Sequence, residues 1–314
     1  MYLYIMGRGR SGSTILDILL GNSNEIASVG ELLFGLSHAD REVCSCGATV
    51  ADCTFWCEVR SRIEAEGIAW EEACGIDTRA TRVWRVWRAG RADPAIAHWA
   101  QITQALARAI TAVAGKPHLI DAGKSPAHGL LLLRYLPDAR VIHLVRDPRH
   151  VLQRYAWRVR SRSHLNARQL ELLRHSALPL LLGEALKWTL VNMVCDLMGR
   201  AFPDRVVRVR FEDLCARPAG EIDRIGAAFD LDLNELRSKA EGHEPLAIGH
   251  TLSGNRLRHA DAVHFDPGGG KAQPPLPRWL EAVSILLCGP LMRRYGYRLR
   301  GDPRPGGSKV AASG

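Results

Sequence analysis

The strongest chemical signal in the sequence lies near its amino end. Residues 2–20 read YLYIMGRGRSGSTILDILL, which is an apolar strand, a glycine-rich turn and a helix that begins with hydroxyl side chains. Such a turn aims backbone N–H groups and the positive end of a helix dipole at one point, where a phosphate binds well. Its glycines let the backbone approach the anion, while its arginine and hydroxyls add charge and donors. The residues concerned are Gly7, Gly9, Arg10, Ser11, Gly12, Ser13 and Thr14.

This turn departs in one place from the P-loop pattern GxxxxGK[ST] of nucleotide-hydrolysing enzymes. Gly7 and Gly12 have the required spacing, but Ser13 stands where the lysine should be. That lysine reaches the β- and γ-phosphates beside Mg²⁺. A P-loop kinase or other nucleotide-binding phosphotransferase is therefore the weaker interpretation.

Three segments, in order, resemble sulfotransferases that use 3′-phosphoadenosine-5′-phosphosulfate (PAPS). Residues 9–14, GRSGST, resemble the loop for the 5′-phosphosulfate, and residues 141–151, VIHLVRDPRHV, resemble the strand and turn for the 3′-phosphate. Residues 209–214, VRFEDL, resemble a later strand-plus-helix element. The resemblance covers about residues 2–300 and is closest to bacterial sulfotransferases related to carbohydrate and tyrosylprotein sulfotransferases. It implies in-line transfer of a sulfuryl group from PAPS to a hydroxyl of a small-molecule or carbohydrate acceptor.

The resemblance also implies roles for individual residues. Glu31, in SVGEL, matches the proposed catalytic base, and Lys124, in DAGKSP, matches a lysine-bearing turn after the second expected strand. Arg10 and Lys124 are expected to stabilise the leaving phosphate, with Ser253 assisting. Arg146 is expected to bind the 3′-phosphate. The other residues expected to bind the donor are Gly9, Arg10, Ser11, Gly12, Ser13, Thr14, Arg154, Asn255 and Arg256.

Two positions depart from the family pattern, and two histidines compete with Glu31 for the role of base. Arg154 stands where serine is usual, and Phe211 stands where tyrosine is often found. Arg154 still offers a charge to the 3′-phosphate, whereas Phe211 has no hydroxyl to offer. His143 lies inside a strand-like run and is expected to be a buried structural residue. His150 follows Arg146 and is the stronger rival.

Side chains can supply what sulfuryl transfer needs, namely positioning, charge stabilisation and removal of a proton, so no metal is assigned to the reaction. Cysteines at 44, 46, 53 and 57 have the spacing C-x-C-x₆-C-x₃-C. This is not a standard zinc pattern, and it leaves open both free thiols and a zinc site made of Cys44, Cys46, Cys53 and Cys57.

A nucleic-acid-binding module is the alternative from another functional class. Lys+Arg exceed Asp+Glu by 42 to 33, giving a net charge of +9, and five arginines recur every third residue between 79 and 91 beside Trp84 and Trp87. On a helix, residues three apart drift by about 60° each, so these arginines form a charged sleeve rather than a binding stripe. No nucleic-acid partner is therefore expected.

The elements that must position these residues follow a βαβ pattern, in which apolar runs of strand length alternate with segments of helical period. The fold expected is α/β, a P-loop-like three-layer α/β/α arrangement around a mainly parallel central sheet. The strands expected are Tyr2–Met6, Leu119–Asp121, Val141–Val145 and Val206–Val209. The helices expected are Ser13–Leu20, Pro126–Leu136, Pro148–Arg160 and Pro218–Phe229. The apolar stretch Ile26–Val29 could return Glu31 to the edge of the sheet.

One insertion, at about residues 38–116, separates the first two expected strands. It contains the cysteine-rich stretch 44–57, a Trp/Arg-rich stretch at 79–93 and a helical run from about Pro94 to Ala114. We expect one sulfotransferase domain over residues 1–301 and a disordered tail over 302–314, which is rich in Gly, Pro and Ser.

The composition indicates a globular protein, with 46% hydrophobic and 24% charged residues in 314. No apolar run approaches the ~20 residues of a membrane-spanning helix, so no membrane span is expected. The first residues lack an export signal, and eight cysteines are too few for a disulfide scaffold. A cytoplasmic location follows as an expectation, while the acceptor and the oligomeric state cannot be read from the sequence.

Overall fold

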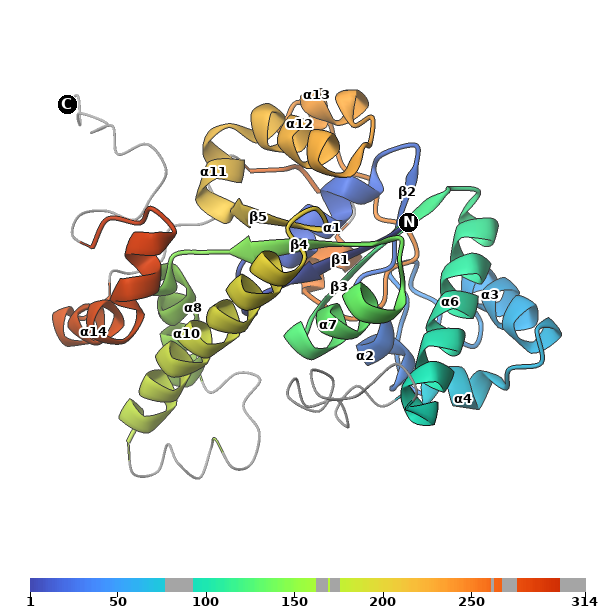
Figure 1. Ribbon diagram of the computed structural model, residues 1–314, viewed down its shortest axis with the longest axis horizontal. Helices are drawn as coiled ribbons and strands as arrows, with labels where there is room; N and C mark the ends of the chain where they lie inside the picture. The colour runs from blue at the N-terminus through green and yellow to red at the C-terminus, as the bar shows by residue number, and fades with distance from the viewer. Residues whose placement is uncertain (77–92, 162–168, 170–175, 261–262, 267–275, 300–314) are drawn as a thin grey trace.

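Five parallel strands form one sheet in the order β2-β3-β1-β4-β5. They are β1 (Tyr2–Met6), β2 (Ile26–Ser28), β3 (His118–Lys124), β4 (Ala139–Val145) and β5 (Val206–Arg210). This computed structural model describes residues 1–76, 93–161, 169, 176–260, 263–266 and 276–299 (Figure 1).

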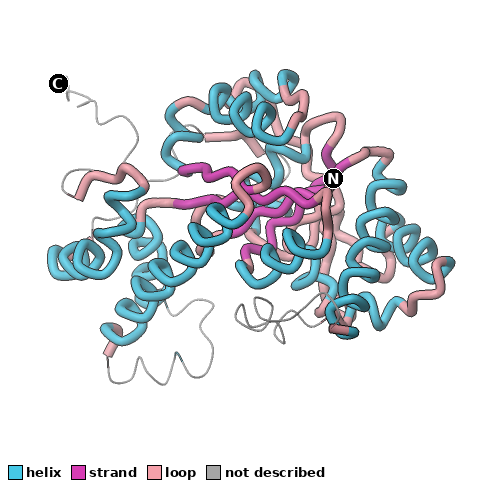
Figure 2. The backbone as a smooth tube through the Cα atoms, in the orientation of Figure 1, coloured by secondary structure: helices cyan, strands magenta, loops and turns pink. Residues whose placement is uncertain are grey.

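The side chains of β1 contribute to two hydrophobic clusters, one on each face of the sheet, because successive side chains of a strand point to opposite faces. Tyr4 and Met6 join one buried cluster, and Leu3 and Ile5 join the other. The helices that cover the Leu3 face are α1 (Ser13–Gly21), α11 (Phe211–Ala216) and α12 (Pro218–Phe229). Those that cover the Tyr4 face are α6 (Pro94–Ala114), α7 (Pro126–Tyr135) and α10 (Leu178–Ala201). The strands lie between helical layers in Figure 2, which confirms the expected three-layer α/β/α fold.

The described part of the insertion begins with an irregular stretch up to residue 53. It continues as helices, with α3 (Thr54–Ala65) and α4 (Trp70–Cys74) packed against α6 (Figure 1). The helical run predicted from Pro94 has the observed bounds, with Asp93 capping its first turn through a bond from the Ala95 N–H. The arginine series of 79–91 and the tail over 302–314 lie outside the described residues.

A third cluster forms beyond the end of β4, where α8 (Pro148–Ser161), α10 and α14 (Arg278–Arg294) pack together. Within the described chain, α10 alone is long and apolar enough to cross a bilayer by length and composition. Its Glu184, Asn192 and Asp196 are nevertheless buried and paired inside the protein. This inward pairing is the behaviour of a core helix.

The short elements are α2 (Leu32–Leu36), η2 (Asn234–Leu236), α13 (Arg237–Ala240) and η3 (Arg256–His259).

The predicted elements are close to the observed ones. The expected strands all occur, and each expected helix begins at its predicted residue. The stretch Ile26–Val29, which was not among the expected strands, supplies the edge strand β2 within Ile26–Ser28. Since β2 ends two residues before Gly30, it brings Glu31 to the edge where the strands end.

Candidate active site

The glycine-rich turn between β1 and α1 has the backbone of an anion-binding loop. Arg10 and Gly12 have positive φ angles of 74° and 96°, and α1 begins directly after Gly12. A Cβ at position 12 would lie 2.3 Å from the ring of Phe211, so only glycine fits there. Gly7, by contrast, does not line the pocket and packs against the carbonyl of Leu144. The turn therefore aims the first N–H groups of α1 outward from the sheet.

A pocket of about 530 Å³ opens at this turn, at the carboxyl ends of the strands. Ligands bind at that edge in open α/β sheets. Every predicted site residue lines it except Ser11, Ser253 and Arg256. The lining residues are Gly9, Arg10, Gly12, Ser13, Thr14, Ile15, Glu31, Lys124, Arg146, Arg154, Phe211, Gly254, Asn255, Leu257, His264, Phe265 and Asp266.

Three arginines bring like charges together on the pocket wall. Burial lowers the pKa of Arg10, and the charges of Arg158 and Arg154 lower it further. Burial likewise lowers the pKa of Arg146, with Arg154 again adding to the effect. Converging cations that depress one another's pKa values are stabilised by an anion placed among them. The wall is thus suited to a ligand with several negative charges.

Arg146 is held in place by its neighbours on the sheet edge. Only 7% of the residue is exposed, its guanidinium lies 4.3 Å from the centroid of Phe211, and Nη1 donates to the carbonyl of Arg10 at 3.5 Å. Asp147 does not neutralise it, because that carboxylate is gripped at 2.7 and 3.0 Å by Arg149. Arg149 is therefore a structural residue, and Arg146 faces the pocket.

Glu212, in the segment 209–214, ties this edge together. It accepts bonds from the N–H of Asp147 at 2.9 Å and from the hydroxyl of Tyr297 at 2.8 Å. Burial raises the pKa of Glu212, but the nearby His150 imidazole and the hydrogen bonds from Asp147 and Tyr297 outweigh it and leave the pKa below its ordinary value. The buried carboxylate thus stays charged and fixes the turn that carries Arg146.

Glu31 and Lys124 form an ion pair in the same pocket. Both side chains are largely buried, with exposed fractions of 19% and 22%. Lys124 ends β3 and has a positive φ of 67°, so the turn after the strand redirects its side chain. A carboxylate and an ammonium consequently meet at one point of the pocket.

Glu31 is positioned by a crossing between distant segments. The Glu31 N–H donates to the Leu252 carbonyl at 2.8 Å, and the Leu252 N–H donates to Val29 at 2.9 Å. Gly30 permits this approach, because its φ is 72° and a Cβ would lie 2.3 Å from the Leu252 oxygen. We call residues 249–255, which cross here, the strap.

Two buried carboxyl groups accept hydrogen bonds from the segment around Glu31. Asp17 accepts from the Ser28 hydroxyl at 2.6 Å, and Asp121 accepts from the Tyr2 hydroxyl at 2.9 Å and the Leu32 N–H at 3.3 Å. Burial is the largest cause that raises the pKa of Asp17 to about 8 and that of Asp121 to about 7. The segment that carries Glu31 is therefore tied to the sheet by groups that hold protons near neutral pH.

Stability is expected to decrease as the pH rises toward 8. An unfolded aspartate has a pKa of about 3.9, so between about pH 4 and 8 the folded protein keeps a proton on Asp17 that the unfolded chain has lost. The slope from this one group reaches about 1.4 kcal/mol per pH unit. Asp17→Asn should flatten the dependence, which urea unfolding at several pH values measures. An unchanged slope in the variant would contradict the assignment.

The remaining predicted residues occupy different surroundings. Ser11 is buried, and its hydroxyl has no hydrogen-bond partner among the described residues. Ser253 is buried beside the pocket, where its N–H donates to Glu42 at 2.8 Å. Arg256 is exposed at the start of η3. The roles expected for these three, like those of the residues that line the pocket, stay predictions.

The rival histidines lie away from the pocket. His143 is buried, donates from Nε2 to the Oδ1 of Asn192 at 2.9 Å, and has a pKa lowered to about 4 by burial. This confirms the expected structural histidine. His150 lies 3.6 Å from Glu212 and does not line the pocket.

Sequence reasoning missed two sets of residues at this site. Leu257, His264 and Phe265 close the pocket from the late part of the chain, where no motif marks them. The sequence also assigned no role to Arg8, which donates two hydrogen bonds, of 2.8 and 2.6 Å, to the carboxylate of Glu184 in α10. The glycine-rich turn is thereby anchored to the far helical layer, a contact that local sequence does not reveal.

Comparisons with known proteins agree with this architecture. The model of the Sulfotransferase family matches residues 3–235. Two similar solved structures are the sulfotransferase domain of the Synechococcus PCC 7002 olefin synthase (19% identity, TM-score 0.50, 95% of each chain covered) and that of the curacin biosynthetic pathway (14%, 0.51, 95% of this chain and 98% of the other). A third is sulfotransferase STF9 from Mycobacterium avium (15% identity, TM-score 0.51, 96% of this chain and 78% of the other).

A search of curated proteins gives no significant match. The solved structures are too distant in sequence to show more than the fold, which is the α/β fold expected. The family model, however, spans most of the chain, including the phosphate loop, the edge that carries Arg146 and the segment 209–214. The chain therefore belongs to the sulfotransferase family.

Proposed function

We propose that this sulfotransferase uses PAPS as its donor and transfers the sulfuryl group to a hydroxyl of a small-molecule or carbohydrate acceptor. The observation that carries the proposal is the meeting, in one pocket, of a phosphate loop, an arginine wall and the Glu31–Lys124 pair. A donor with two separate phosphate groups requires two anion sites, and the loop and the arginine wall provide them.

The residues present fit such a donor. Ser11 has a buried hydroxyl without a partner among the described residues, next to the N–H groups that begin α1. Arg146 and Arg154 form the second cationic region on the same wall. The volume of about 530 Å³ lies in the ~300–1,000 Å³ range of small-molecule sites. The 5′-phosphosulfate is assigned to the loop and the 3′-phosphate to the arginines.

When bound, PAPS supplies an activated sulfuryl group and leaves as adenosine 3′,5′-bisphosphate. Glu31 takes the proton from the acceptor hydroxyl as the new O–S bond forms. Lys124 and Arg10 stabilise the negative charge that develops on the leaving phosphate as the old S–O bond breaks. The pocket wall keeps these groups in position, which lowers the entropic part of the barrier.

Turnover is expected to need no Mg²⁺, because Arg10, Lys124 and the N–H groups of α1 supply the charge that Mg²⁺ supplies in phosphotransferases. The measurement is the initial rate with and without added Mg²⁺, in buffer freed of divalent cations. Equal rates are the expected result. A rate that vanishes without Mg²⁺ and returns with it would instead favour the phosphotransferase interpretation.

A thermal-shift panel tests the function as a whole. Adenosine 3′,5′-bisphosphate should raise the melting temperature, since a ligand at a hundred times its Kd stabilises the folded state by about 2.7 kcal/mol. ATP with Mg²⁺ and an oligonucleotide should give smaller shifts. A larger shift with either of them would overturn the proposal in favour of a kinase or a nucleic-acid-binding protein.

Two further parts of the proposal are the sulfuryl acceptor and the location of the enzyme in the cell. Labelled PAPS incubated with the enzyme and an extract of its source would identify the sulfated product directly. A cytoplasmic location is proposed because eight cysteines in 314 residues are too few for a disulfide scaffold.

A further inference from the structure

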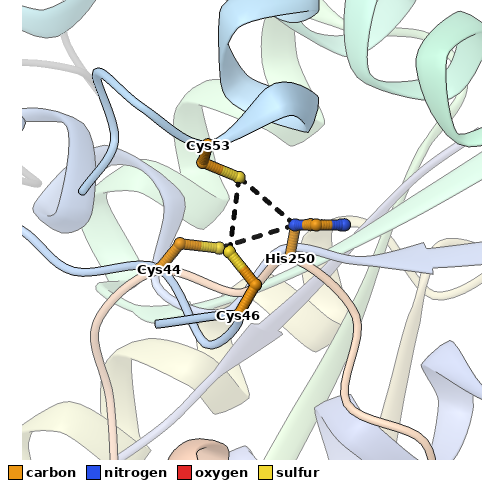
Figure 3. A group of neighbouring side chains, drawn as sticks. All are labelled: Cys44, Cys46, Cys53 and His250. Carbon is orange, nitrogen blue, oxygen red and sulfur yellow. Dashed lines mark hydrogen bonds between the residues drawn. The ribbon is translucent and has the colours of Figure 1, made fainter. Parts of the chain in front are cut away.

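Four side chains converge beside the active site, away from the residues assigned to the reaction. Cys44, Cys46 and Cys53 come from the start of the insertion, and His250 comes from the strap (Figure 3). Their three Sγ atoms and one imidazole nitrogen all lie within 4.8 Å of one another. The strap therefore meets the insertion through a set of three thiols and one imidazole.

The spacings of these atoms fit a tetrahedral metal ion. Zinc bonds of about 2.3 Å to sulfur and 2.0–2.1 Å to nitrogen imply edges of about 3.8 Å between sulfurs and about 3.6 Å between sulfur and nitrogen. The Sγ atoms of Cys46 and Cys53 are 3.7 Å apart. Nδ1 of His250 lies 3.3 Å from the Sγ of Cys53 and 3.7 Å from that of Cys44.

A disulfide does not describe this cluster. A disulfide requires an S–S distance of about 2.05 Å, whereas Cys46 and Cys53 are 3.7 Å apart and all four cysteines of the insertion's first part are free thiols. It would also leave the third thiol and the directed imidazole unexplained.

We propose that Cys44, Cys46, Cys53 and His250 bind one Zn²⁺ ion in a structural Cys₃His site. Four protein ligands fill a tetrahedral coordination sphere and leave no position for water or substrate, which distinguishes a structural site from a catalytic one. The set differs from the four cysteines considered from the sequence. Cys57 turns away and donates its S–H to the carbonyl of Ala51 at 3.0 Å, and His250 takes its place.

The surroundings hold the ligands in position. The ring of Phe55 stacks on His250, with centroids 4.9 Å apart and planes 2° from parallel. Cys53 is the N-cap residue of α3, so the start of that helix fixes its backbone. Cys44 and Cys46 lie in a tight turn in which the N–H of Cys44 donates to Ala48 at 2.8 Å and that of Gly47 donates to Cys44 at 2.9 Å. Such outer contacts orient metal ligands.

Arg258 links the two ligand-bearing segments. Its Nη1 donates to the carbonyls of Val43 and Thr251, the residues next to Cys44 and His250, at 2.8 and 3.1 Å. Its Nη2 pairs with Glu42 at 2.7 Å, which holds the guanidinium in this position.

The proposed zinc site also affects the active-site pocket, because it holds the strap in place. Ser45 and Thr251 exchange hydrogen bonds between the two segments, at 3.1 Å from the Ser45 N–H and 2.9 Å to its hydroxyl. Leu252, the next residue, holds the backbone of Glu31. Gly254 lines the pocket, and a Cβ there would lie 3.5 Å from both Glu31 and Thr14. The ion thus joins the insertion to the segment that positions the proposed base.

The test is metal analysis of the full-length protein purified under reducing conditions. About one zinc per chain is expected. Cys46→Ser and His250→Ala should lose most of that zinc, while the matched control Cys57→Ser should keep it. Zinc-free protein titrated with Co²⁺ should show the visible absorption bands of tetrahedral thiolate coordination. His250→Cys should keep the metal and shift those bands, which covers the case in which His250→Ala does not fold.

These measurements test the zinc site by metal content and absorption, so they do not depend on the enzyme's activity. Wild-type protein that contains no zinc, and takes up neither Zn²⁺ nor Co²⁺ when reduced, overturns it. Loss of zinc from Cys57→Ser to the same extent as from Cys46→Ser overturns the ligand set. A disulfide between Cys46 and Cys53 that survives purification under reducing conditions also overturns it.

Discussion

Glu31→Gln is expected to lower kcat by at least about a hundredfold, since removal of a general base costs on the order of 10²–10⁴ in rate. Glutamine keeps the size of the side chain and an oxygen that can accept from Lys124, so the fold and the donor site should survive. The melting temperature and the affinity for adenosine 3′,5′-bisphosphate should therefore change little. The loss should appear in the rate of the chemical step.

The pH profile adds a second readout. The acidic limb of the rate profile reports ionisation of the base, so this limb should disappear in the variant. Glu25→Gln is the matched control, because Glu25 precedes β2 and does not line the pocket. If Glu31→Gln keeps most of its activity, or loses donor binding as strongly as rate, Glu31 is not the base. Another acid or histidine near the pocket would then have to be tested.

The fold could be predicted because its main elements carry local signals. Proline in the first turn marks the starts of α7 and α12, and glycine separates β1 from α1. The central strands β1 and β4 are short, largely apolar runs buried on both faces, as expected of a parallel sheet.

Helix α10 could not be predicted because its apolar residues do not mark one face: Trp188 and Met198 are buried, whereas Leu197 is exposed. Its buried side carries Glu184, Asn192 and Asp196, each paired with a distant residue, while Leu190 is 59% exposed. Periodicity identifies two faces of a helix but assumes that the apolar one is buried. Here pairing across the fold decides which face lies inside.

The site could be predicted only in part, for a similar reason. The phosphate loop is continuous in sequence, so its residues share one signal. The contact between Leu252 and Glu31, and the cluster of His250 with Cys44 and Cys53, join segments about two hundred residues apart. No spacing rule within a motif reaches across that distance. The raised pKa values of Asp17 and Asp121 likewise depend on burial, which arises only when the chain has folded.

Arg146→Ala is expected to weaken binding of adenosine 3′,5′-bisphosphate by ~2–4 kcal/mol, or about 30- to 900-fold, through loss of charge-assisted bonds. Binding of adenosine 5′-phosphate, which lacks the 3′-phosphate, should be nearly unchanged. Isothermal titration with both ligands measures the difference. Arg160→Ala is the matched control, since it removes one exposed positive charge from α8 and leaves the pocket wall intact.

The comparison of two ligands matters because Arg146 has a second contact. Its Nη1 donates to the carbonyl of Arg10, so truncation could also loosen the phosphate loop. A loosened loop would weaken both ligands equally, and that result would make Arg146 a structural residue. A selective loss is the expected outcome, because burial and Arg154 already disfavour the charge on Arg146 and a phosphate at the arginine wall relieves that penalty. The difference between the two losses of binding free energy thus measures how much the buried charge of Arg146 contributes to recognition of the 3′-phosphate.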